Sequence, residues 1–77
     1  TKKITRQLVF TISHHDAEQK DEIVKGLQRL AITAEVRKIS LKNDLLELSI
    51  EVIVNEEKLK DVQDFLLANK YIKDFSY

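Results

Sequence analysis

Residues 46–54 carry the most regular alternation of side chains in the chain, with the period of two that marks a β-strand. One face of this segment would present Leu46, Leu48, Ile50, Val52 and Val54. The opposite face would present Glu47, Ser49, Glu51 and Ile53. The segment therefore predicts a strand in a sheet that packs a core on one side only.

Residues 4–12 show the same period and predict a first strand. Ser13 and Asp16 are candidate N-caps for a helix that begins near Asp16 or Ala17. Its apolar stripe contains Ile23, Val24, Leu27, Leu30 and Ala31. Gly26 lies inside this helix, where a missing side chain would permit a close approach to the sheet.

Residues 32–41 predict a second strand, but the apolar positions change parity near Arg37 and Lys38. Such a change indicates a bulge, or a strand with two useful faces. Asn43 and Asp44 follow, and both residue types tolerate left-handed backbone. We therefore expect a tight hairpin that leads into the strand at residues 46–54.

A second helix is predicted from Asn55, a suitable N-cap, to about Asn69 or Lys70. Its buried stripe contains Leu59, Val62, Phe65 and Leu66. Residues 71–77 are rich enough in aromatic and β-branched side chains to form a short final strand.

The order strand, helix, strand, strand, helix, strand predicts an α+β fold, a ferredoxin-like βαββαβ sandwich. Its sheet would have four antiparallel strands, with both helices on one face and the first and third strands in the centre. A chain of 77 residues has room for a single core, so we treat residues 1–77 as one domain.

Charge and composition favour a soluble domain that does not bind nucleic acid. Thirteen basic and thirteen acidic residues give a formal net charge of zero, and their signs are interleaved. The strand at residues 46–54 has no aromatic or basic side chain on which bases could stack. No apolar run reaches the roughly 20 residues of a membrane span. The absence of methionine suggests a domain excised from a larger protein, with removal of an initiator methionine before Thr1 as the alternative.

The only local cluster of chemically active residues is Ser13-His14-His15-Asp16, between the first strand and the first helix. It has two interpretations, namely helix capping with exposed histidines, or contact with a small ligand or metal ion. Adjacent histidines are poorly placed to hold one ion together, and no third ligand is identifiable, so no metal site is assigned. The chain also lacks cysteine and any phosphate-binding or nucleophile motif. We therefore expect neither catalysis nor a cofactor.

The sheet face away from the helices is expected to carry Val9, Ile39, Leu41 and Ile53, with Phe75 or Tyr77 as possible additions. An uncovered sheet face with several aliphatic side chains suggests a partner, although scattered surface residues of this kind also occur in monomers. We expect a homodimer, formed through this face or through an edge strand.

The order of the elements, the polar turn after the first strand and the closing segment Tyr71-Ile72-Lys73-Asp74-Phe75 resemble an ACT-type regulatory domain. Such domains usually have Asp-x-Pro-Gly at the entry to the first helix, where this chain has His14-His15-Asp16-Ala17. The ACT resemblance implies a regulatory module of a soluble enzyme or regulator that senses an amino acid or a metal ion.

A narrower resemblance is to the C-terminal ACT-like domain of the magnesium transporter-C (MgtC/SapB) membrane proteins. It rests on the basic start with Lys2 and Lys3, the two amphipathic helices, and the ending Ile72-Lys73-Asp74-Phe75. This resemblance implies a non-catalytic, dimeric cytoplasmic tail of a bacterial inner-membrane protein linked to magnesium homeostasis. The tail would touch the membrane only through an upstream transmembrane region, with its basic start on the positive side.

Overall fold

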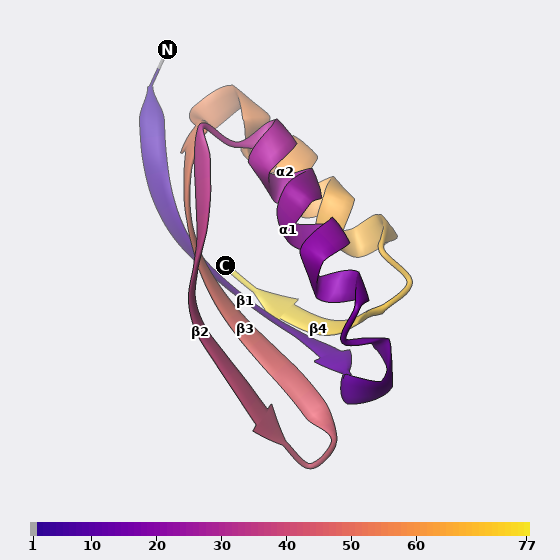
Figure 1. Cartoon of the computed structure of the whole chain (residues 1–77). Coiled ribbons are helices and arrows are strands. Elements are labelled where there is room, and N and C mark those ends of the chain that lie inside the picture. The colour runs from indigo at the N-terminus through magenta and orange to yellow at the C-terminus, as the bar shows by residue number, and fades with distance from the viewer. Residues whose placement is uncertain (1) are drawn as a thin grey trace.

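Figure 1 shows the computed structural model of the chain, which describes residues 2–77. The elements in chain order are β1 (Lys3–Ser13), the 3-10 helix η1 (His14–Asp16), α1 (Gln19–Leu30), β2 (Thr33–Lys42), β3 (Leu45–Asn55), the 3-10 helix η2 (Glu56–Lys58), α2 (Leu59–Ala68) and β4 (Ile72–Ser76). All four predicted strands and both predicted helices are therefore present.

The strands form one antiparallel sheet in the order β2-β3-β1-β4, and both helices lie on the same side of it (Figure 1). This confirms the predicted ferredoxin-like α+β fold, with β1 and β3 in the centre. We call the sheet side that carries the helices the helix side, and the other side the open face. Directly paired residues of antiparallel strands point to the same side, so the register assigns each side chain to one of them.

The core lies between the helices and the two central strands. β1 contributes Leu8, Phe10 and Ile12, and β3 contributes the alternate residues from Leu48 to Val54. The helices contribute their predicted stripes, of which Ile23, Leu27, Val62 and Leu66 are fully buried. The same alternation that predicted β3 thus fills one continuous layer of apolar side chains.

Each edge strand contains one bulge, and each bulged residue is basic. In β2, Val36 pairs with Ile50 and Lys38 with Ser49, which leaves Arg37 as the extra residue. In β4 the register also shifts by one residue, and Lys73 is left without a partner on β1. Bulges and cationic side chains both discourage further strands from pairing with a sheet edge. The predicted irregularity near Arg37 is confirmed, whereas the bulge in β4 was not foreseen.

The β2–β3 hairpin turns at Asn43 and Asp44, whose φ angles of 52° and 64° confirm the predicted left-handed backbone. Ser13 caps η1, because its Oγ accepts a hydrogen bond from the His15 amide at 3.2 Å. The other two predicted N-caps are wrong in detail. Asp16 lies inside η1, so that α1 begins only at Gln19, and Asn55 precedes η2 without a side-chain capping bond.

Gly26 allows a close approach between the two helices, and not the predicted approach to the sheet. A Cβ atom at this position would overlap the ring of Phe65 on α2. The glycine is therefore explained by helix packing, since any larger residue must displace that ring.

The helices are much shorter than the three long strands of the sheet, β1, β2 and β3. α1 has 12 residues and spans about 18 Å, whereas β3 has 11 residues and spans about 36 Å. In Figure 1 the turn end of the β2–β3 hairpin accordingly extends beyond both helices.

No helix among residues 2–77 is long and apolar enough to cross a membrane.

Candidate functional site

The cluster Ser13-His14-His15-Asp16 lies where the sequence predicts it, at the passage from β1 to α1, and forms the end of β1 and all of η1. Its backbone is tied to the β2–β3 hairpin, because the His14 amide donates a 2.9 Å hydrogen bond to the carbonyl oxygen of Asp44. The cluster thus joins two parts of the chain that are far apart in sequence.

The two histidine rings lie against each other, with centroids 4.1 Å apart and ring planes inclined by 38°. His14 Nδ1 lies 3.3 Å from the carbonyl oxygen of Asp44 and 3.7 Å from its carboxylate. His14 and the Ser13 hydroxyl are therefore occupied by contacts within the protein. Within residues 2–77 no group of three or more His, Cys, Asp or Glu side chains is arranged to hold a metal ion.

The predicted composition of the open face is wrong for two of its four residues. Val9 and Ile53 do lie there, but Ile39 pairs with Leu48 and Leu41 with Leu46, both on the helix side. The reason is the bulge at Arg37, which adds one residue and returns the later apolar positions to the side of Val36. The expected change of face does not take place.

The same correction applies to Phe75. It pairs with Phe10 and packs against the core, so it lies on the helix side of the sheet. The ring of Tyr77 stacks on that of Phe75, with centroids 6.2 Å apart. The open face is consequently far less apolar than its sequence pattern indicated.

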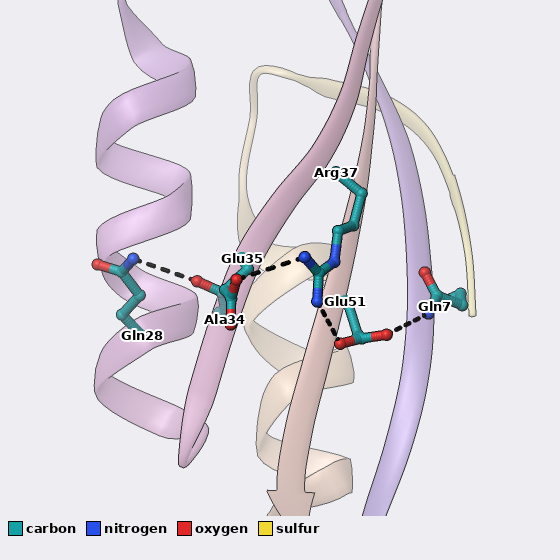
Figure 2. Close-up of polar contacts among 6 residues, drawn as sticks. All are labelled: Gln7, Gln28, Ala34, Glu35, Arg37 and Glu51. Atoms are coloured by element: carbon teal, nitrogen blue, oxygen red, sulfur yellow. Dashed lines mark hydrogen bonds and ion pairs between the residues drawn. The ribbon is translucent and has the colours of Figure 1, made fainter.

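A polar network crosses three strands of the open face, as Figure 2 shows. Arg37 Nη2 donates a 2.7 Å hydrogen bond to Glu51 Oε1, and Arg37 Nη1 lies 3.5 Å from Glu35 Oε2. Gln7 Nε2 donates to the second oxygen of Glu51 at 3.1 Å. Sequence reasoning missed this network, because only the register places Gln7 of β1 and Glu35 of β2 on either side of Glu51.

The network keeps both of its central groups charged. The hydrogen bond and the charge of Glu51, with a smaller effect of Glu35, raise the pKa of the Arg37 guanidinium. The hydrogen bonds from Arg37 and then Gln7, with the charge of Arg37, lower the pKa of the Glu51 carboxyl. Both shifts favour the charged forms, which is the behaviour of an ion pair at the surface.

Exposed apolar side chains gather on the helix side of β2, beyond the reach of α1. Val36, Ile39 and Leu41 are 40%, 48% and 64% exposed, and we call these three residues the β2 strip. Ile32, just before the strand, is also exposed, so the segment 32–41 supplies four of the six exposed large apolar residues among residues 2–77. The sequence identified Ile39 and Leu41 as exposed apolar residues but assigned them to the wrong side.

A second, smaller feature lies between the end of α2 and β4. A pocket of about 250 Å³ is lined by Leu66, Leu67, Ile72, Lys73, Asp74 and Phe75. Four of its lining residues are apolar and two, Lys73 and Asp74, are charged, so its walls are mixed. Its volume is slightly below the range of about 300–1,000 Å³ that is usual for small-molecule sites. No pattern in the sequence pointed to this pocket, because it forms only when β4 pairs with β1 beside α2.

Comparisons with protein-family models, with curated protein sequences and with solved structures each gave no significant match.

Proposed function

We propose that this domain is a non-catalytic interaction module that binds a protein partner through the β2 strip. The observation that carries the proposal is the concentration of exposed apolar side chains on this one strand. Such grouping is typical of docking surfaces, whereas single exposed aliphatic residues need no explanation. Ala34, which lies on the same side of the same strand, is buried by contrast.

The energy available from the β2 strip favours a weak and reversible contact. Full burial of an aliphatic side chain contributes about 1.5–3 kcal/mol, so three residues that are roughly half exposed would contribute about 2–4 kcal/mol. Association itself costs about 4–15 kcal/mol. The partner must therefore add comparable apolar area of its own, or be held close to the domain by other means.

The resemblance to the MgtC/SapB proteins supplies the cellular setting of the proposal. In that setting the domain is the cytoplasmic tail of a bacterial inner-membrane protein linked to magnesium homeostasis. Its support is the order of the elements together with the ending Ile72-Lys73-Asp74-Phe75 in β4 and the basic start at Lys2 and Lys3. Tethering to a membrane would also raise the local concentration that a weak contact requires.

A growth experiment with the whole protein tests this function. A bacterial strain without the protein is complemented with the natural gene or with an Ile39→Ser/Leu41→Ser variant, each carrying a fluorescent protein on this domain. We expect both proteins in the membrane fraction at equal abundance, with growth in limiting Mg²⁺ restored only by the natural sequence. Equal growth of the two strains would contradict a role for the β2 strip, and fluorescence outside the membrane fraction would contradict the membrane setting.

The alternative function is that of an ACT-type sensor, which binds an amino acid or a metal ion at Ser13, His14, His15 and Asp16. These residues are adjacent at η1, but the Ser13 hydroxyl already accepts a hydrogen bond from the His15 amide, and the His14 ring contacts Asp44 of the hairpin. Titration of the isotope-labelled domain with MgCl₂ and with an amino-acid mixture, followed by NMR, distinguishes the two functions. Saturable shifts at residues 13–16 that are lost in a His14→Ala/His15→Ala variant would establish the sensor.

A further inference from the structure

The shape of the uncovered surface decides what can dock on it. The β2 strip is a part of the helix side that α1 is too short to reach, and it continues the apolar layer of the core at Leu46 and Leu48. A partner would therefore rest on the face of the hairpin beside α1, and would extend the helical layer instead of the sheet.

Pairing with the outer edge of β2 is opposed by three features of that strand. The bulge at Arg37 interrupts it, and Gln28 Nε2 of α1 donates a 3.2 Å hydrogen bond to the carbonyl oxygen of Ala34 (Figure 2). An antiparallel pairing of two copies centred on Ser40 would also place Lys38 opposite Lys42 twice. Like charges opposite each other destabilise a sheet, so an added strand is the less favourable arrangement.

We propose that the occupant of the β2 strip is a second copy of this chain, packed face to face about a twofold axis. This proposal rests on the proposed function above and identifies its partner. A purely apolar patch is complementary to itself, which a twofold contact requires. The formal net charge of zero removes the long-range repulsion that usually keeps copies of a protein apart. Lys38 and Lys42 lie on the open face, where they stay in water when the helix sides meet.

The area of the surface limits the strength of this dimer. A stable interface buries about 800 Å² per partner, which is about one sixth of the 5014 Å² surface of this domain. The β2 strip provides only the centre of such an area, and the polar rim around it must provide the rest. We therefore expect a dissociation constant between about 10 μM and 1 mM, so that dimers appear only at high local concentration.

Sedimentation velocity across that concentration range tests the proposal. The natural chain should change from monomer to dimer, while Ile39→Ser/Leu41→Ser should remain monomeric and Val9→Ser/Ile53→Ser, the matched change on the open face, should dimerise as before. Circular dichroism of each variant verifies its fold. A dimer that survives the Ile39→Ser/Leu41→Ser change, or a natural chain that stays monomeric throughout, overturns the proposal. The growth experiment in limiting Mg²⁺ tests the broader interaction function separately, because its outcome does not depend on which partner binds the β2 strip.

Cysteine cross-linking gives a second test that does not depend on destabilising variants. The described chain contains no free cysteine, so an introduced thiol is the only one present. A short bis-maleimide reagent should join two copies of Leu41→Cys into a covalent dimer, because sheets that pack face to face lie about 10 Å apart, beyond the roughly 7 Å between Cα atoms that a direct disulfide allows. Thr11→Cys on the open face is the matched control and should stay monomeric. A faster reaction of Thr11→Cys than of Leu41→Cys would place the interface on the open face and overturn the proposal.

Discussion

Both halves of β2 point apolar side chains toward the helix side of the sheet, yet these side chains differ sharply in burial. Ala34 in the first half is 5% exposed beneath α1, whereas the larger and more apolar Leu41 in the second half is 64% exposed. Side-chain hydrophobicity cannot explain this difference, because it would favour burial of Leu41 over burial of Ala34. The difference follows from the lengths of the elements, since a helix advances less than half as far per residue as a strand. An apolar surface can therefore remain open because the layer above it ends too soon.

The strongest way to test this comparison is to truncate one leucine from each region. Leu27 on α1 is fully buried, so Leu27→Ala should lower the free energy of unfolding by about 2–5 kcal/mol. Leu41→Ala should lower it by less than about 1 kcal/mol, because most of that side chain is already in water. Urea denaturation at a concentration where the domain is monomeric measures both. Similar losses would mean that Leu41 is packed and would remove the contrast between the regions.

The covered region can be examined further at the contact between the two helices. Gly26→Ala should destabilise the domain by about 1–3 kcal/mol through its clash with Phe65, in spite of a gain in helix propensity of about 1 kcal/mol. Thermal and urea unfolding measure the effect. Lys25→Ala, an exposed change on the same helix, should be nearly neutral. Gly26→Ala combined with Phe65→Leu should recover part of the loss, and a stabilised single variant would show that the helices are not in close contact.

In the uncovered region, the backbone of the hairpin is predicted to be more sensitive than its apolar side chains. Asp44 has a φ of 64°, a conformation that glycine adopts more easily than alanine does. Asp44→Ala should therefore be less stable than Asp44→Gly by about 1 kcal/mol. Both variants lose the carboxylate near His14, so the difference between them reports on the backbone alone. Equal stability of the two would mean that the turn changes its conformation.

The smallest effect is expected on the open face, at the Arg37–Glu51 pair. The pKa of Glu51 is lowered in the folded chain, so its ion pair stabilises the fold above the ordinary glutamate pKa of about 4.3. That stabilisation is lost as the pH falls through the lowered value. Arg37→Gln should raise the pKa of Glu51, which NMR titration of its carboxyl carbon measures, while Lys38→Gln should not. The stability difference between Arg37→Gln and the natural chain should disappear in acid, where Glu51 is protonated. A difference that persists in acid would show that it does not arise from the Arg37–Glu51 ion pair.

The sequence predicted the elements and their order because each long segment has a clear period. The alternation in β3 and the stripe of α1 both reflect one buried face, and local spacing is sufficient to recognise it. Short-range chemistry also predicted Ser13 as a cap and the hairpin at Asn43 and Asp44. The cluster from Ser13 to Asp16 was placed correctly, but its contact with Asp44 depends on the distant hairpin.

The predicted face of Ile39 and Leu41 is wrong because a one-residue insertion in β2 changes the assignment of faces. The pattern around Arg37 allowed either a bulge or a strand with apolar residues on both faces. The second interpretation placed Ile39 and Leu41 beside Val9 and Ile53. Pairing with β3 absorbs Arg37 as a bulge, so both residues stay on the helix side. A sequence cannot settle this by periodicity, because a bulge and a change of face produce the same string of residues.

By itself the sequence determined the fold class and the supply of apolar residues, since both follow from the spacing of side chains along each element. Tertiary structure alone decided which of those residues remain exposed. That exposure depends on where α1 ends above β2. Tertiary structure also decided the register that unites Gln7, Glu51, Arg37 and Glu35, and the approach of α2 to Gly26. These are relations between elements distant in the chain, and no local pattern encodes the distance over which a short helix can cover a long strand.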